Sequence, residues 1–81
     1  MVSRDFSGRE IVSVLQSFGY VHDRTRGDHA ILKYHHPTAD ETRTVTVPLH
    51  DRVRIGTLQN IAEQCGAKDF RAWCQWIDEH R

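Results

Sequence analysis

A histidine that follows a glycine and has cationic neighbours is the feature of this sequence best suited to chemistry. The histidine is His29, and around it stand Arg26, Gly27 and Lys33. A neutral imidazole accepts and returns a proton near physiological pH, which suits general acid–base catalysis on a ribose hydroxyl or a leaving oxygen. The glycine lets the backbone bend or approach a ligand closely, and the cations favour a phosphate group. The alternative interpretation is a solvated histidine at the exposed start of a strand.

A second histidine, His50, follows a predicted strand that ends at Pro48. If this strand pairs antiparallel with the strand that starts at His29, the end of one lies near the start of the other. We therefore expect His50 near His29, where two histidines could divide the acid and base roles. A structural role for His50, such as a hydrogen bond to a backbone carbonyl, is the open alternative.

Most other kinds of active site lack support in the sequence. No serine stands in a nucleophile-elbow pattern, no glycine-rich phosphate loop is present and no carboxylate pair stands out. The adjacent His35 and His36 are expected to point apart, and a zinc site from His22, His29 and His50 has neither cysteines nor regular spacing behind it, so no metal site is predicted. Phosphodiester cleavage assisted by the substrate's own 2′-hydroxyl remains, because it needs mainly a proton carrier and cationic groups.

The elements that must position these residues follow from the apolar pattern. We predict a first helix at Gly8–Phe18, after a Ser7–Glu10 capping box. Three strands follow at Tyr20–Arg24, His29–Tyr34 and Arg43–Val47, with a turn at Thr25–Asp28 between the first two. Two more helices are predicted at Leu58–Cys65, with Thr57 as N-cap, and at about 68–80. Three antiparallel strands with helices on one face make an α+β two-layer sandwich, the arrangement also found in double-stranded RNA-binding domains.

Length and charge limit the remaining choices. At 81 residues the chain is long enough for one domain with one core. The net charge of zero, with histidine neutral, argues against a strong grip on nucleic acid through bulk electrostatics, although Arg43, Arg52 and Arg54 form a local basic cluster. The spacing of Cys65 and Cys74 indicates buried free thiols on helices.

The apolar residues of the sequence form neither a membrane-spanning segment nor a signal peptide. No apolar run approaches the roughly 20 residues that cross a bilayer, and the N-terminal residues have no apolar signal region. We therefore expect a cytoplasmic protein without a membrane partner.

Five short segments become specific when their order and spacing are taken together: Ser7-Gly8-Arg9-Glu10, Phe18-Gly19-Tyr20, Gly27-Asp28-His29, Val45-Thr46-Val47-Pro48-Leu49-His50, and Gly56-Thr57-Leu58 with Ile61. In this order they resemble the HicA toxin family, the mRNA interferases of HicA–HicB toxin–antitoxin systems. The resemblance covers a family core of about 7–70 within a single domain of residues 1–81, and leaves the predicted C-terminal helix with Trp73 and Trp76 as an extension.

The resemblance implies an endoribonuclease that cleaves mRNA without a metal or other cofactor and is neutralised by a HicB-like antitoxin. It also implies a fold like a double-stranded RNA-binding domain and a catalytic histidine in a Gly-Ser-His motif, which corresponds to His29. By position, we expect an RNA-binding surface made of Arg26, Gly27, Lys33, Arg52 and Arg54.

One position departs from the family pattern, because Asp28 stands where the family usually has serine. A carboxylate beside the histidine favours the charged imidazole and repels phosphate. Activity is therefore expected to be lower, shifted in pH or lost. If it is lost, the alternative function is a non-catalytic RNA-binding or partner-binding module of the same fold.

Overall fold

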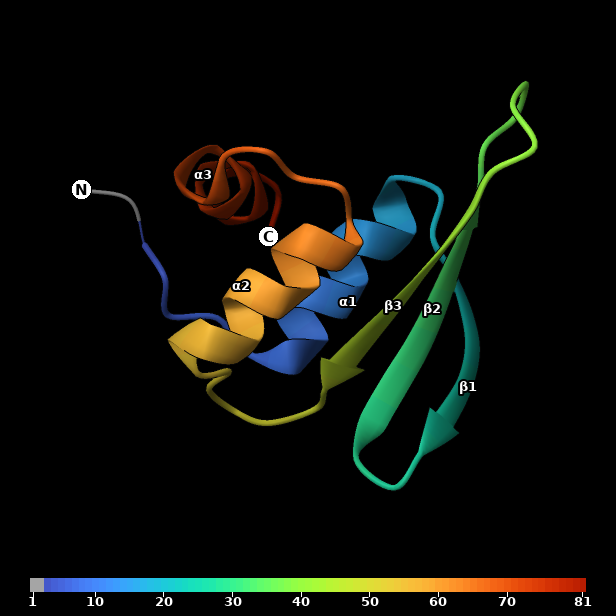
Figure 1. The fold of residues 1–81 in the computed structure, drawn as a ribbon. Helices are drawn as coiled ribbons and strands as arrows, with labels where there is room; N and C mark the ends of the chain where they lie inside the picture. The colour runs from blue at the N-terminus through green and yellow to red at the C-terminus, as the bar shows by residue number, and fades with distance from the viewer. Residues whose placement is uncertain (1–2) are drawn as a thin grey trace.

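The chain folds in the predicted order of helix, three strands and two helices, and the computed structural model describes residues 3–81 (Figure 1). The elements are α1 (Gly8–Ser17), β1 (Val21–Arg26), β2 (His29–His35), β3 (Thr42–Pro48), α2 (Ile55–Gln64) and α3 (Phe70–His80). Helices α1 and α2 both pack against β3, and α3 packs on α1 and α2. The predicted α+β fold with an antiparallel sheet is confirmed.

The first helix begins at the predicted capping box. The Ser7 side chain accepts a hydrogen bond from the backbone N–H of Glu10 at 3.1 Å, and the Glu10 carboxylate accepts one from the backbone N–H of Ser7 at 2.9 Å. Two amide groups that the helix cannot satisfy internally are thus paired. The helix ends one residue before the predicted Phe18, which is its C-cap, and Gly19 follows with a φ of 99°.

Strand β2 lies in the centre of the sheet, between β1 and β3. Ala30 and Leu32 are buried against the helices, whereas His29 is exposed and Lys33 is only partly buried on the opposite face. This alternation confirms the predicted assignment of His29 and Lys33 to one face, because side chains two residues apart in a strand point the same way. Strand β1 is exposed along its whole length.

The connection between β1 and β2 differs from the predicted four-residue turn at Thr25–Asp28. Thr25 and Arg26 still pair with Ala30 and His29, so β1 runs two residues further than predicted. Only Gly27 and Asp28 form the turn, and Gly27 has a φ of 58°. A two-residue hairpin with glycine first is a type II′-like turn, whose twist suits the paired strands.

Helix α2 begins at Ile55, three residues before the predicted start, and its N-cap is Arg54 rather than Thr57. The reason is tertiary: Val53 is buried, and its N–H donates a hydrogen bond to the backbone oxygen of Phe6 at 2.9 Å. This contact fixes the chain just before the helix, and an N-cap preference of threonine is too weak to override it. Thr57 therefore lies inside the helix.

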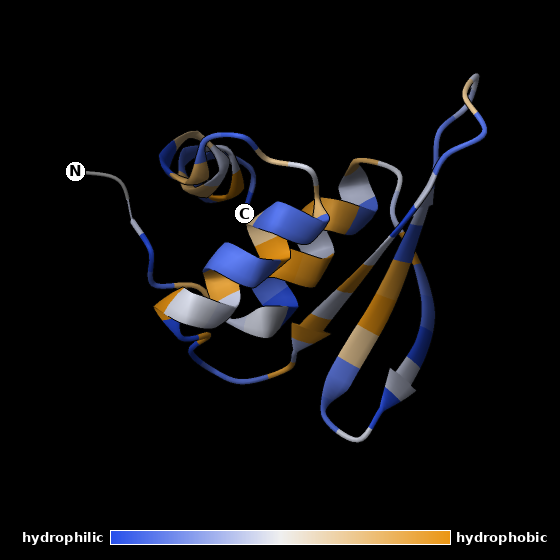
Figure 2. Cartoon of the chain, viewed as in Figure 1, coloured by the Kyte–Doolittle hydropathy of each residue, from blue (hydrophilic) through white to orange (hydrophobic). Residues whose placement is uncertain are grey.

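The core lies between the sheet and the helices and joins Leu32 of β2 and Val45 and Val47 of β3 to apolar residues of all three helices. Figure 2 shows hydrophobic residues both along the sheet and along the helices that cover it. Cys74 is fully buried as predicted, but Cys65 is only partly buried. Trp73 belongs to the core, and Trp76 packs partly buried with its ring 4.7 Å from the ring of Phe18. Among residues 3–81, no helix is long and apolar enough to span a membrane.

Candidate active site

The register of the sheet brings the two predicted histidines together. His29 pairs with Pro48 across β2 and β3, and His50 follows two residues later. The two imidazole rings lie with their centroids 6.5 Å apart. The predicted proximity of His29 and His50 is therefore confirmed.

A single carboxylate joins the two histidines. One oxygen of Asp28, Oδ1, lies 2.8 Å from Nδ1 of His29, and the other, Oδ2, lies 2.7 Å from Nε2 of His50. The backbone oxygen of Asp28 also accepts a hydrogen bond from the N–H of Leu49 at 2.6 Å. Through these contacts the β1–β2 turn is tied to the segment that follows β3.

These contacts determine which ring nitrogens are available to a ligand. When each neutral imidazole donates its N–H to the Asp28 carboxylate, the lone pair stays on Nε2 of His29 and on Nδ1 of His50. The side-chain hydrogen bond from His50, together with the positive charge of protonated His29 and His50, holds the pKa of Asp28 below its ordinary value. The carboxylate is thus ionised throughout the pH range in which histidine titrates.

The lowered pKa of Asp28 yields a prediction for acid solution. We expect the titration midpoint of the Asp28 carboxyl, followed by NMR, to lie below 3.8 in the wild type and to rise in His50→Ala, since His50 is the largest cause of the shift. Because the folded-state pKa is depressed, the stabilisation is present above the unfolded-state pKa and is lost as pH falls through the folded-state pKa. An unchanged midpoint in His50→Ala would contradict the contact.

The start of α1 holds the segment that carries His50. The N–H of Gly8 donates a hydrogen bond to the backbone oxygen of His50 at 2.9 Å. A Cβ atom at Gly8 would collide with the backbone oxygen of Pro48. Only glycine therefore allows α1 to approach the end of β3 this closely.

We expect Gly8→Ala to destabilise the protein by about 1–3 kcal/mol, the usual cost of inserting a methyl group into a closely packed site. The measurement is urea unfolding followed by circular dichroism. Gly56→Ala is the matched control, because Gly56 also stands in the first turn of a helix but nothing lies within 4 Å of its added Cβ. The control is expected to be neutral or stabilised by about 0.4–1 kcal/mol. Equal stability of the two variants would contradict the close approach.

Beside the two histidines lies a pocket of about 400 Å³ between the end of β3 and α2. Its α2 wall consists of Thr57, Asn60, Ile61 and Gln64, and Arg54 stands at its rim. These wall residues were not predicted from the sequence, although their helical spacing of three and four residues could have indicated a shared face. The Gln64 side chain also accepts a hydrogen bond from the backbone N–H of Thr46 at 3.0 Å, which covers the free edge of β3.

The predicted cationic residues lie at different distances from this pocket. Arg26 pairs directly with His29 across the hairpin, and Arg54 lines the pocket itself. Lys33 lies four residues along β2 from His29, about 13 Å at the rise of a strand, and its ammonium group is 3.9 Å from Asp23. Arg26 and Arg54 are thus close to the histidines, whereas Lys33 is not.

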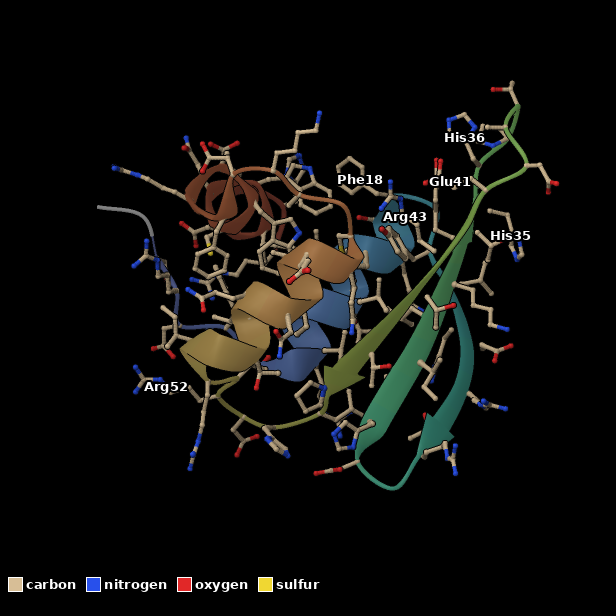
Figure 3. All side chains as sticks on the ribbon, in the orientation of Figure 1. Phe18, His35, His36, Glu41, Arg43 and Arg52 are labelled. Atoms are coloured by element: carbon tan, nitrogen blue, oxygen red, sulfur yellow. The ribbon has the colours of Figure 1, made fainter. Side chains whose placement is uncertain are left out.

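Two further predicted positions complete the set. Gly27 forms the turn next to Asp28, and a Cβ atom there would meet nothing within 4 Å, so its positive φ rather than lack of space favours glycine. Arg52 is exposed on the segment before α2 and points away from the helices in Figure 3. Its guanidinium group lies 3.3 Å from Asp5.

The other histidines lie apart from the pair. His35 and His36 are at the end of the sheet opposite the β1–β2 turn (Figure 3), and Nδ1 of His36 accepts hydrogen bonds from the loop amides of Thr38 and Ala39. His22 contacts Thr25 at 2.8 Å on β1. Within residues 3–81, no group of three or more histidine, cysteine or carboxylate side chains is arranged to hold a metal ion.

Comparison with known proteins agrees with this arrangement. The family model described as the HicA toxin of bacterial toxin–antitoxin systems matches residues 8–67. Neither the curated proteins nor the solved structures contain a significant match. The match covers α1, the whole sheet and α2, including both histidines of the pocket. The chain therefore belongs to the HicA toxin family.

Proposed function

We propose that this protein is an endoribonuclease toxin that cleaves mRNA without a metal cofactor, with His29 as a general acid–base group. The observation that carries the proposal is the pair of imidazoles, His29 and His50, oriented by one carboxylate beside a pocket. Membership of the HicA toxin family supports the same activity. In this reaction one proton leaves the 2′-hydroxyl and another reaches the leaving 5′-oxygen, so two neighbouring imidazoles suit it.

In the proposed reaction, one neutral imidazole removes the proton from the 2′-hydroxyl of the substrate. The 2′-oxygen then forms a bond to phosphorus while the bond from phosphorus to the 5′-oxygen breaks. The second imidazole, initially protonated, donates its proton to that leaving oxygen. The products are a 2′,3′-cyclic phosphate and a free 5′-hydroxyl, and the two histidines end with exchanged protonation states.

Asp28 orients the two imidazoles in this mechanism. Because it accepts a hydrogen bond from each ring, it directs Nε2 of His29 and Nδ1 of His50 away from itself. Arg26 and Arg54 offset the repulsion between this carboxylate and the substrate phosphate.

The same carboxylate supports a second candidate function. Asp28 is more than half exposed beside the pocket, where a negative charge weakens phosphate binding. If this repulsion dominates, the protein is a non-catalytic RNA-binding or partner-binding module. The activity of Asp28 variants distinguishes the two functions.

The proposed RNA-binding surface extends beyond the pocket. Arg26 and Gly27 lie beside the histidines, Lys33 lies further along β2, and Arg52 and Arg54 precede α2. Among these positions we assign phosphate contacts first to Arg26 and Arg54, since they are nearest to the pocket. A HicB-like antitoxin that covers the pocket would block access of RNA to both histidines.

The function is tested with purified protein free of antitoxin, shown to be folded by circular dichroism. We expect it to cleave a mixed-sequence RNA both with and without EDTA. Intact RNA under both conditions would overturn the ribonuclease proposal, and loss of cleavage upon chelation would overturn the metal-independent mechanism.

A further inference from the structure

A second, larger cleft of about 940 Å³ lies beside the candidate active site. Its walls are the N-terminal segment 3–5, the segment 52–54 with Ile55 at the start of α2, and Arg71 on α3. Four arginines line it, against the single carboxylate of Asp5: Arg4, Arg52, Arg54 and Arg71. We call it the arginine cleft.

Most of this positive charge is not neutralised within the protein. In residues 3–81, Arg52 is the only one of the four arginines that forms an ion pair, and both it and its partner Asp5 are mostly exposed. The guanidinium group of Arg4 lies 5.5 Å from the centre of the Phe70 ring, which positions the cation without removing its charge. The cleft therefore presents a concentrated positive potential, although the whole chain has a net charge of zero.

The arginine cleft adjoins the candidate active site at one residue. Arg54 lines both the cleft and the histidine pocket, so it marks the place where the two meet. A strand bound at His29 and His50 can continue past Arg54 into the cleft. A groove lined by positive charge is how proteins follow the backbone of a single strand, which carries one negative charge per nucleotide.

Two of the four arginines lie outside the region that the family model matches. The match ends at residue 67 and begins at residue 8, whereas Arg71 belongs to α3 and Arg4 to the N-terminal segment. The arginine cleft is thus completed by segments that flank the matched region.

We infer that the arginine cleft binds the backbone phosphates of RNA nucleotides that flank the cleaved bond. This inference rests on the proposed function for the identity of the polyanion as RNA. Contacts of arginine with phosphates position a strand without reading its sequence. The cleft would therefore increase affinity for longer RNA and leave the choice of cleaved bond to the pocket.

The test measures binding rather than cleavage. A 2′-O-methyl oligoribonucleotide cannot undergo the proposed reaction, so its affinity can be followed by fluorescence anisotropy over a range of salt concentrations. In Arg4→Gln/Arg71→Gln we expect an affinity loss on the order of 10-fold. The salt slope, meaning the decrease in the logarithm of the binding constant per tenfold increase in salt concentration, should be smaller by about 1.4, the value for two phosphate contacts on a single strand. A dinucleotide should bind to the variant and to the wild type equally.

Lys68→Gln is the matched control, because Lys68 is exposed between α2 and α3 and does not line the cleft. Equal salt slopes in the double variant and in this control would overturn the inference. Arg71→Gln alone is a second variant that avoids any effect of removing Arg4 from Phe70, and a slope smaller by about 0.7 is expected for it. If the wild type binds RNA through the cleft but cleaves none, the proposed ribonuclease function fails, whereas the binding of RNA phosphates by the cleft stands.

Discussion

Replacing His29 by alanine is expected to lower kcat for RNA cleavage by about 10²–10⁴-fold, the usual contribution of a general acid or base. The side chain of His29 is half exposed at the start of β2 and belongs to no part of the core, so the fold should persist. The measurement is single-turnover cleavage of a labelled RNA. His35→Ala is the matched control, since His35 is an exposed histidine at the other end of the same strand.

The role of His50 is tested in the same assay. We expect His50→Ala to lose rate by a similar factor, and the double variant His29→Ala/His50→Ala to be little slower than either single variant, because residues that act as a unit are not additive. The bell-shaped pH dependence of the rate expected for the wild type, which falls at both low and high pH, should fall on only one side in His50→Ala. A wild-type profile in His50→Ala, or a wild-type rate in His29→Ala, would contradict the proposed pair.

The second large effect is expected at Asp28. An asparagine has almost the same shape, but its amide group offers one acceptor oxygen in place of two, so it can accept a hydrogen bond from only one of the two rings. We expect Asp28→Asn to lower kcat on the order of 10-fold. The loss should be smaller than the roughly 10⁴-fold loss at a buried triad aspartate, since the Asp28 side chain is 57% exposed.

Asp28→Ser gives the opposite result under the two candidate functions. If Asp28 orients the histidines, serine lowers kcat as asparagine does, with little change in KM. If the carboxylate instead weakens phosphate binding, serine raises activity and lowers KM. Cleavage by Asp28→Ser that is faster than that of the wild type would therefore contradict the orienting role.

Much of the fold follows from local pattern. The capping box at Ser7 and Glu10 sets the start of α1 through contacts within one turn, and the alternation around Leu32 sets the buried face of β2. The proximity of His29 and His50 was also predictable, since the antiparallel pairing of neighbouring strands brings their opposite ends together.

Features that depend on contacts between distant segments were not predicted. The start of α2 depends on the hydrogen bond between Val53 and Phe6, so the threonine signal at Thr57 misplaced it. The link made by Asp28 depends on a two-residue turn whose backbone is also bonded to Leu49. From the sequence, Asp28 was visible only as a charge beside His29.

In the candidate site, too, local pattern predicted some features and missed others. Arg26 and Arg54 lie beside the histidines. Lys33 lies on the same face of the sheet as His29 but away from it, and it pairs with Asp23. A strand pattern gives the face of a side chain and not its distance from a ligand. The α2 wall of the pocket requires the packing of α2 against β3, which no local pattern determines.

The most direct test compares two labelled oligonucleotides of the same sequence, one with ribose throughout and one with 2′-deoxyribose at the cleaved position. With folded wild-type protein in EDTA, we predict cleavage of the first to a 2′,3′-cyclic phosphate and no cleavage of the second. His29→Ala should cleave the all-ribose substrate about 10²–10⁴-fold more slowly than the wild type and should not cleave the 2′-deoxy substrate. Cleavage of the 2′-deoxy substrate, or equal cleavage of the all-ribose substrate by His29→Ala, would contradict the proposal that His29 and His50 transfer the protons of a 2′-hydroxyl-assisted reaction.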